Sequence, residues 1–461
     1  MANLVDVVAR EAILFAGFGL LVGGIDDLCI DLLFLLRRLL RRGAPRRHVA
    51  ALPEPDADAT TVVFVAAWDE GAVIGGMLSA AVARYDHPVY RIYVGVYPND
   101  QATIDAVAAV AARDARVVPI VGERDGPTTK ADCLNTLWRA LRRDEDAGLA
   151  VRAIVFHDAE DVVHPAELRV FDALITDHDV VQLPVLPLVK RGARLVSGHY
   201  ADEFAEAHVK QMVVRTALGA AMPLAGTGCA LSPAMLRRIA EERGGDPFDA
   251  DSLVEDYELG LRIAALGGRA CFARVDDGAG GVVAVRAYFP DTVDAAVRQK
   301  ARWMTGIALA GWDRTGWARP LAIADHWMRM RDRRAPLAVV VLATAYLALV
   351  AWSVAATVHW LLGQDSGILP AWAWPLLLVN AALFVWRVGV RAAITGRVYG
   401  MIEACWSVPR LVVGNYVALL AARRAVGRYV GMLRGAALTW DKTRHDFPDL
   451  GDTGGLGVAS R

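Results

Sequence analysis

Two long apolar stretches without charged residues, near the C-terminus, constrain this chain most. Residues 336–363 and 368–386 contain no Asp, Glu, Lys or Arg, and Trp372, Trp374 and Trp386 lie toward the ends of the second stretch. A helix needs about 20 apolar residues to cross a hydrocarbon core of about 30 Å, and tryptophan favours the membrane interfaces. We therefore expect two antiparallel membrane spans joined by a short loop at residues 364–367, which agrees with a mean hydropathy of +0.32.

A third candidate span, residues 12–36, is interrupted by Asp26, Asp27 and Asp31. An ionised Asp in mid-bilayer costs about 2.5 to 3.5 kcal/mol on insertion scales. We expect one span whose acidic face meets other helices, with Arg387, Arg391 or Arg410 as partners of the carboxylates; the alternative is an apolar stretch at 12–25 followed by an interfacial helix. Because the segment lacks a basic n-region and a small-residue cleavage site, we expect it to be retained.

Arginine clusters set the expected orientation. They lie after the first span and before the second, at Arg37, Arg38, Arg41, Arg42, Arg46 and Arg47 and at Arg329, Arg331, Arg333 and Arg334. Basic residues favour the cytoplasmic side, so the region between the clusters should be cytoplasmic and the N-terminus outside. Residues 398–422 have arginines on both flanks, and their longest uncharged run, 411–422, is too short to cross. We expect that segment to be interfacial or re-entrant, giving three spans.

Charge and cysteine usage exclude two kinds of site. The chain has 50 basic and 51 acidic residues, for a net charge of −1, which offers no whole-chain electrostatic basis for nucleic-acid binding. Its five cysteines form no CxxC pair, so we expect neither a disulfide framework nor a zinc site. The soluble part should therefore face a reducing compartment.

Between residues 60 and 307, short β-branched runs alternate with longer mixed segments. The runs at 60–67, 89–96, 116–120 and 152–157 are typical of strands, and helix-like segments begin at Gly71, Gln101 and Lys130. This alternation predicts an α/β domain with a mainly parallel sheet. Ligands of such sheets bind beyond the carboxyl ends of the strands, so the residues after each strand are the candidate site.

Acidic residues follow three of these predicted strands. They are Glu70, Asp100, Asp158, Glu160 and Asp161. The last three fall within four residues and repel one another unless a cation neutralises them; a hard divalent ion would do so and would also bind a diphosphate. The alternative is a solvated acidic turn in which Asp161 caps a helix that starts near Pro165.

Two further motifs lie downstream. Glu255 and Asp256 precede a helix-like segment at 259–266, where the alternative is simply a capped helix start. Gln299, Arg302 and Trp303 occupy helix positions i, i+3 and i+4, which places an amide, a guanidinium and an indole on one face. Arg binds phosphate through paired hydrogen bonds and Trp stacks on sugar rings, and the same helix could also lie on the membrane.

In this order and spacing, the three motifs resemble those of the processive membrane synthases of glycosyltransferase family 2, which combine a GT-A fold with membrane spans. Segments 126–135 and 24–28 look like those of the bacteriophage-adsorption protein B family. That family is the inner-membrane glycosyltransferase of a bacterial surface-glycan and phage-receptor system. The resemblance extends over about residues 12–448, with Glu160 and Val254 replacing the usual Asp and Thr of two motifs.

The resemblance implies a role for each motif. Asp158 and Glu160, with Asp161 sharing the role, would hold a divalent metal, Mg or Mn, on the donor diphosphate. Asp256, beside Glu255, would be the general base toward the acceptor hydroxyl. The diphosphate and acceptor platform would comprise Gln299, Arg302 and Trp303, with Gly226, Thr227 and Gly228 as the acceptor loop. The nucleotide donor would be bound by Glu70, Asp100, Lys130, Asn135 and Asp158.

The implied architecture is an α/β GT-A domain at residues 48–310 flanked by transmembrane helices. Around it we expect an N-terminal span with a basic juxtamembrane segment (1–47), an amphipathic interfacial segment (311–335) and two spans (336–388). Interfacial or re-entrant helices (389–434) and a cytoplasmic tail (435–461) would follow. The Gly-rich tail is not expected to supply the cyclic-dinucleotide-sensing module that some members carry.

The resemblance implies inverting, metal-dependent transfer from a nucleotide-diphospho-sugar, with a UDP-linked donor, by a processive synthase of a secreted or surface polysaccharide. The enzyme would be a multi-pass protein of the bacterial inner membrane with a cytoplasmic catalytic domain. Its partners would be a glycan or lipid-linked acceptor, the bilayer, and an outer-membrane export or receptor protein. Two alternatives stay open: single-sugar transfer to a polyprenyl phosphate, and a non-catalytic receptor or scaffold with a relic transferase domain.

Overall fold

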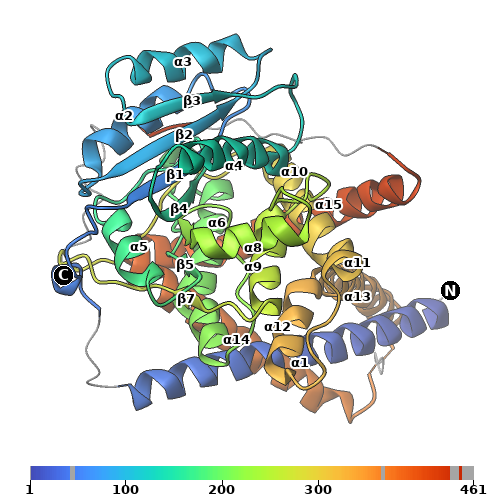
Figure 1. The fold of residues 1–461 in the computed structure, drawn as a ribbon. Helices are drawn as coiled ribbons and strands as arrows, with labels where there is room; N and C mark the ends of the chain where they lie inside the picture. The colour runs from blue at the N-terminus through green and yellow to red at the C-terminus, as the bar shows by residue number, and fades with distance from the viewer. Residues whose placement is uncertain (1, 42–46, 365–368, 437–445, 449–461) are drawn as a thin grey trace.

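A seven-stranded mixed sheet organises the larger part of the chain (Figure 1). The computed structural model describes residues 2–41, 47–364, 369–436 and 446–448. The strand order is β3-β2-β1-β4-β6-β5-β7, with β6 antiparallel to both of its neighbours and the other pairs parallel. The strands are β1 (Thr60–Ala66), β2 (Tyr90–Val96), β3 (Val117–Val121), β4 (Val151–His157), β5 (Val180–Gln182), β6 (Cys229–Leu231) and β7 (Ala270–Phe272).

Helices cover both faces of this sheet, which explains why its strands are apolar runs rather than alternating ones. In β1, Val63 and Val65 face a core shared with α2 (Ile74–Arg84), α3 (Gln101–Ala111) and α5 (Glu167–Ile175). Val62 and Phe64 face the opposite core, which is shared with α4 (Lys130–Asp146), α8 (Pro233–Glu242) and α9 (Glu255–Ala265). The predicted α/β class is confirmed, and each of the four predicted strands agrees with β1 to β4 within one residue at either end.

The remaining helices connect the sheet domain to four long ones. The connecting elements are η1 (Val49–Ala51), η2 (Arg191–Ala193), α6 (Val196–Glu206), η3 (Ala207–Gln211), α7 (Met212–Ala217), α10 (Val293–Trp303), η4 (Met304–Leu309), α11 (Gly311–Thr315) and α12 (Ile323–Arg333). The long helices are α1 (Ala2–Leu40), α13 (Ala335–Leu362), α14 (Ala373–Tyr399) and α15 (Met401–Leu433). Within the described ranges, these four are long and apolar enough to span a membrane.

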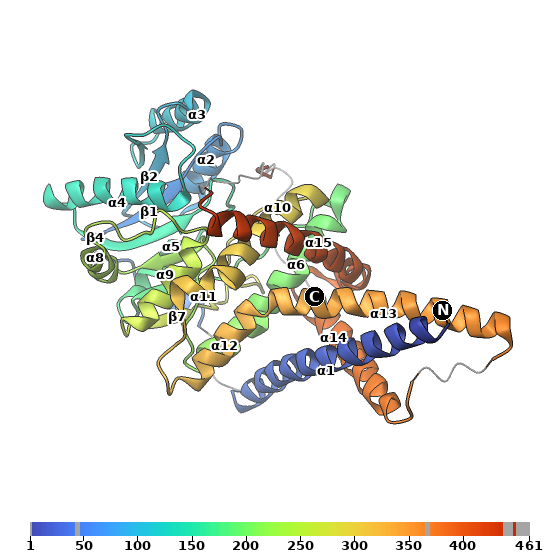
Figure 2. The same cartoon turned by 90° about the vertical axis from the view of Figure 1, so that its right-hand side faces the viewer.

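Helices α1 and α13 lie side by side and antiparallel (Figure 2). Two polar contacts set their register: His359 Nε2 lies 3.0 Å from an Asp6 carboxylate oxygen, and Asp26 pairs with Arg334 at the start of α13. The part of α1 alongside the uncharged α13 is therefore about residues 6–26. The expected span at 12–36 lies within the apolar helix segment Leu4–Leu40, and Asp26, Asp27 and Asp31 lie at or beyond the end of the part of α1 that runs alongside α13.

The carboxylates that interrupt α1 are all paired with basic groups. Asp26 and Asp27 contact Arg331 and Arg334, and Asp27 also lies 3.0 Å from Arg387. Asp31 is buried and accepts hydrogen bonds from Lys210 and, at 2.9 Å, from Trp386 Nε1. Arg387 was an expected partner and is confirmed. The other two expected partners bind elsewhere, because Arg391 pairs with Glu206 and Arg410 with Asp202 and Glu403.

Residues 389–434, which we expect to be interfacial or re-entrant, comprise the end of α14 and the whole of α15. Helix α14 continues to Tyr399, the chain turns at Gly400 with φ +90°, and α15 is one continuous helix. Helix α15 packs against α10 and α6 of the sheet domain as well as against α14. The boundary between the expected third span and the expected interfacial segment thus falls at Gly400. By length and composition alone, α15 also qualifies as a fourth span.

Candidate active site

The three acidic and basic motifs converge on one cavity. It is open to solvent, has a volume of about 1090 Å³ and lies beyond the carboxyl ends of β1 and β4. Its lining includes ten of the predicted site residues: Glu70, Lys130, Asp158, Glu160, Asp161, Glu255, Asp256, Gln299, Arg302 and Trp303. The location agrees with the rule that ligands of such sheets bind at the carboxyl ends of strands.

Lys130 stands at the centre of the acidic groups. It is the first residue of α4, whose N-cap Thr129 accepts a hydrogen bond from the backbone N–H of Asp132 at 3.2 Å. Its ammonium donates to Asp158 and, at 3.2 Å, to the Gly226 carbonyl, and lies 3.9 Å from Glu255. Burial alone would lower the pKa of Lys130, but the charges of Asp158 and Glu255 outweigh burial and raise it. The lysine is therefore charged and links the two acidic motifs.

Asp256 projects from the first turn of α9 into the cavity. Its Oδ1 accepts a hydrogen bond of 2.7 Å from the backbone N–H of Tyr257. Burial first, and then the neighbouring Glu255 carboxylate, raise the pKa of Asp256 to about 7, although Lys130 and Arg302 act in the opposite direction. A carboxylate with a pKa near neutrality is suited to accept a proton.

Gly226 keeps the approach to Asp256 open. Its φ is +75°, and a Cβ at this position would lie 2.5 Å from Asp256 Oδ2. A side chain there would be strained by the backbone and would collide with the carboxylate. The predicted acceptor loop is therefore placed directly against Asp256.

Asp161 differs from the other two carboxylates of its motif. Its side chain is 1% exposed and accepts hydrogen bonds from the Asp158 backbone N–H at 2.9 Å and from Thr227 Oγ1. It also lies 2.8 Å from His157 Nδ1, while His157 Nε2 lies 2.7 Å from Glu167. The buried Asp161 side chain thus holds the motif in place through these hydrogen bonds. The idea that it caps the next helix is wrong, because α5 begins at Glu167 after Ala166, which makes no side-chain cap.

His157 between two carboxylates is a buried charged centre that the sequence did not reveal. Burial lowers the pKa of His157, but Glu167 and Asp161 outweigh it and raise the pKa to about 10. We expect Glu167→Ala to lower the free energy of unfolding by about 3 kcal/mol, because a buried cation loses one of its partners. Thermal unfolding of the purified variant measures this, with Glu241→Ala, at an exposed position of α8, as the matched control. Equal melting temperatures for the two variants would contradict the expectation.

The acidic residues fit a divalent metal only as a pair. Among the described residues, no group of three or more His, Cys, Asp or Glu side chains is placed to hold a metal ion. Asp158, with a side chain 34% exposed, and Glu160 both line the cavity and offer hard oxygen donors. Mg²⁺ is commonly bound by one or two carboxylates together with substrate phosphates, so the donor set fits a metal that a diphosphate completes.

The face of α10 that points into the cavity carries the predicted amide, guanidinium and indole. Gln299, Arg302 and Trp303 all line it, which confirms the shared face. In the described part of the chain, Gln299 Oε1 and Arg302 Nε are buried without a hydrogen-bond partner. Leaving such groups unpaired costs about 1 to 3 kcal/mol each, so the face is built to bind a polar ligand.

An aromatic wall next to Trp303 escaped the sequence analysis. Phe204 from α6 lies 6.2 Å from Trp303 and 4.8 Å from Phe289 between ring centroids, and all three line the cavity. Nothing in the sequence around Phe204 indicates this position. Phe289, followed by Pro290 just before α10, offers only the weak signal that a rigid loop precedes the motif helix.

Two predicted nucleotide-binding residues do not line the cavity. Asp100 caps α3 by accepting from the Thr103 N–H at 3.3 Å and also accepts from the Asp69 N–H at 2.6 Å. Asn135 exchanges hydrogen bonds of 2.9 and 3.0 Å with the backbone of Phe248. Their polar atoms are thus engaged in the scaffold, and each holds a loop in place from outside the cavity.

Comparisons with known proteins agree with this site. The family described as "Glycosyltransferase like family 2" matches residues 57–306. Bacteriophage adsorption protein B of Escherichia coli K12 and bacteriophage N4 adsorption protein B of E. coli O157:H7 are each 36% identical over 94% of the chain. The chain spans 62% of the length of these two relatives.

One solved structure is similar over almost the whole chain. It is the mannosyltransferase PcManGT from Pyrobaculum calidifontis in complex with GDP-Man and Mn²⁺, with a TM-score of 0.55 and 19% identity. The match covers 92% of this chain and 99% of that one. At this identity the similarity establishes the fold, a GT-A-like sheet domain with membrane helices.

Proposed function

We propose that this chain, which belongs to the glycosyltransferase-like family 2, transfers a sugar from a nucleotide-diphospho-sugar to an acceptor hydroxyl. The observation that carries this proposal is the cavity itself. It brings together two half-buried carboxylates, Asp158 and Glu160, a buried carboxylate with a pKa near 7, and an arginine whose Nε has no partner among the described residues. Each of these groups meets one requirement of the reaction.

The proposed mechanism assigns these requirements to individual side chains. Asp158 and Glu160 would hold a divalent metal, Mg or Mn, which supplies charge stabilisation for a departing diphosphate. Arg302 would bind the same phosphates, and Gln299 beside it a further polar group. Asp256 would accept the proton of the acceptor hydroxyl as the oxygen attacks the anomeric carbon. One base and no covalent intermediate give inversion at that carbon.

Lys130 has a defined part in this scheme. It holds Asp158 and the Gly226 carbonyl together, so it aligns the metal-binding motif with the loop against Asp256. If Asp158 held a divalent metal, Lys130 would keep its hydrogen bond to the Gly226 carbonyl and would have Glu255, 3.9 Å away, as its acidic partner. Asp161 and His157 support this arrangement from below. The complexes of the similar mannosyltransferase with GDP-Man and Mn²⁺ support the donor class, and we propose a UDP-linked donor here.

The proposed product is a secreted or surface polysaccharide, made by repeated addition. The packing of α15 against α10, the aromatic wall of the cavity and the similarity to phage adsorption proteins support this proposal. A glycan or lipid-linked acceptor and an outer-membrane export or receptor protein are the proposed partners. Single-sugar transfer to a polyprenyl phosphate would give a product one sugar long, so product length separates the two enzymatic candidates.

The test is nucleotide release from a panel of nucleotide sugars by the purified protein. We expect release from at least one donor with Mg²⁺ or Mn²⁺, and its loss when EDTA removes the metal, because the two carboxylates alone cannot neutralise the leaving diphosphate. No release from any donor, with acceptor present, would instead favour a receptor or scaffold with a relic transferase domain. Release unaffected by EDTA would contradict the proposed metal dependence.

We also propose a location in the bacterial inner membrane with the sheet domain in the cytoplasm. In the three-span arrangement the N-terminus is outside, the loop after α13 is outside and the end of α15 is inside. In a Cys29→Ala/Cys405→Ala background, a membrane-impermeant maleimide should label Gln364→Cys in spheroplasts and leave Ala436→Cys unlabelled. Labelling of Ala436→Cys in sealed spheroplasts would mean that α15 crosses the membrane, and the three-span arrangement would fail.

A further inference from the structure

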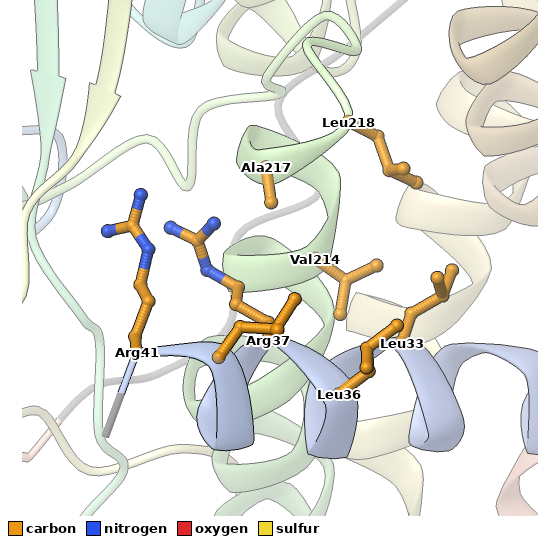
Figure 3. A pocket seen from close by; sticks show the side chains of 8 residues that line it. Leu33, Leu36, Arg37, Arg41, Val214, Ala217 and Leu218 are labelled. Atoms are coloured by element: carbon orange, nitrogen blue, oxygen red, sulfur yellow. The ribbon is translucent and has the colours of Figure 1, made fainter.

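A second hollow lies between the C-terminal end of α1 and helix α7 (Figure 3). It has a volume of about 550 Å³ and is open at the surface. Apolar side chains line most of it, among them Leu33 and Leu36 of α1 and Val214 of α7. Arg37 and Arg41 complete the lining, and their guanidinium groups extend to the same side of α1. The hollow shares no lining residue with the active-site cavity.

The two arginines form an uncompensated pair of charges. They stand at positions i and i+4 of one helix, where like charges repel. Among the residues that the structure describes, no carboxylate lies within 4.0 Å of either guanidinium, whereas Arg331, Arg334, Arg387 and Arg391 are all paired with acids. An anion between Arg37 and Arg41 would relieve the repulsion and accept charge-assisted hydrogen bonds from both.

The same end of α1 is strongly apolar on its exposed side. Leu32, Leu35, Leu39 and Leu40 are between 40% and 77% exposed, and this part of α1 extends past Asp26, where the contact with α13 ends. Leucines with arginines on one helix end are typical of the boundary between hydrocarbon and water. A ligand of this hollow must therefore suit both an apolar wall and two cations.

We propose that the hollow binds an anionic glycerophospholipid of the cytoplasmic leaflet, with its phosphate between Arg37 and Arg41 and the upper part of an acyl chain against Leu33, Leu36 and Val214. A soluble phosphate would leave the apolar wall unused. A zwitterionic lipid would place its own cation beside the two arginines. An anionic lipid meets both features, and basic pockets at the cytoplasmic side of membrane helices suit such headgroups.

The bound lipid would join the membrane helices to the sheet domain. Helix α7 is fixed on its other side to α12, because Arg215 forms two hydrogen bonds of 2.7 and 2.9 Å with Asp332. Helix α1 already packs on α7 and α12 through Ile30, Val214 and Met328, so a lipid in the hollow would extend this attachment toward Arg37 and Arg41. The inference does not depend on the proposed transferase activity, since it uses no residue of the active-site cavity.

Lipid binding by the purified full chain tests the proposal. The delipidated protein in a neutral detergent is titrated with phosphatidylglycerol and, separately, with phosphatidylcholine of the same acyl chains, and bound lipid is counted by native mass spectrometry. We expect phosphatidylglycerol to bind at least about fivefold more tightly, since one basic side chain near an anionic headgroup contributes about that factor. Arg37→Gln should lower the phosphatidylglycerol affinity about fivefold and leave phosphatidylcholine unchanged.

Two matched variants separate a built site from a general charge effect. Arg38→Gln removes the same charge from the neighbouring position, which does not line the hollow, and should leave the affinity unchanged. Ala217→Phe keeps both arginines but fills the hollow, and should lower the affinity for phosphatidylglycerol. An unchanged melting temperature shows that each variant is folded.

Several results would overturn the proposal. Equal affinity for the two phospholipids, or equal losses in Arg37→Gln and Arg38→Gln, would mean that no specific site exists. Displacement of phosphatidylglycerol by glycerol phosphate at similar concentration would assign the arginines to a soluble phosphate. Tighter binding of undecaprenyl phosphate than of phosphatidylglycerol would assign the hollow to a polyprenyl lipid instead.

Discussion

Asp256→Asn is expected to lower kcat by about 10³-fold while leaving the affinity for the donor nucleotide within a few-fold. The amide keeps the shape of the side chain and can still accept the hydrogen bond from the Tyr257 N–H. It cannot take a proton, and general-base catalysis contributes about 10² to 10⁴ in rate. Turnover with a nucleotide sugar and an acceptor, together with titration of the nucleotide alone, separates the two effects.

The matched control for this variant is Asp251→Asn, an exposed carboxylate five residues earlier, in the loop that leads into α9. It removes the same charge without touching the cavity and should leave kcat unchanged. A wild-type kcat for Asp256→Asn would show that another group accepts the proton. A large loss of nucleotide affinity in the same variant would place Asp256 on the donor rather than on the acceptor.

The pKa of Asp256 gives the reaction a predicted pH dependence. The base works in its ionised form, so kcat/KM should rise with pH up to about 7, the pKa of Asp256, and level off above it. Glu255→Gln removes the second-largest cause of the raised pKa, after burial, so the rise should move to lower pH. A rise at the same pH in both proteins would mean that another group controls it.

The sequence predicted the fold and the site best where an apolar run or a local motif determines the structure. Strand β1 is buried along its whole length and β4 is buried from Ala153 onward, so the apolar runs of these central strands differ sharply from the flanking helices, whereas the edge strand β3 is only partly buried. The acidic motif after β4 and the i, i+3, i+4 face of α10 needed only local geometry to reach the cavity. Ten of the predicted site residues are therefore found together.

The sequence says less where tertiary partners decide what a side chain contacts. Asp100 and Asn135 look like ligand-binding residues in the sequence, yet a helix end and the backbone of Phe248 satisfy them. The role of Asp161 depends on His157 and Glu167, which is ten residues from that histidine. The register of α1 depends on arginines about 300 positions away, at 331 and 334. No local pattern contains these partners.

Asp158→Asn is expected to remove most of the metal-dependent part of donor binding. The substitution removes one of the two half-buried carboxylates that line the cavity. Even the loss of a residue that only supports a metal ligand lowers metal affinity by about 10- to 100-fold. The nucleotide diphosphate should therefore bind at least about 100-fold more weakly in the presence of Mn²⁺. In EDTA, where the metal makes no contribution, the variant and the wild type should bind it equally.

Substitution by Asn rather than Ala separates the loss of a metal ligand from the loss of the contact with Lys130. Lys130 donates to Asp158, and an Asn oxygen can still accept that hydrogen bond, so Lys130 remains aligned with Gly226. Asp161→Asn is the complementary control, because it disturbs the buried contacts with His157 and Thr227 and should lower the melting temperature more than the Mn²⁺ affinity. If Asp158→Asn bound the nucleotide as well as the wild type with Mn²⁺ present, Asp158 would not be a metal ligand, and its hydrogen bond with Lys130 would be its main role.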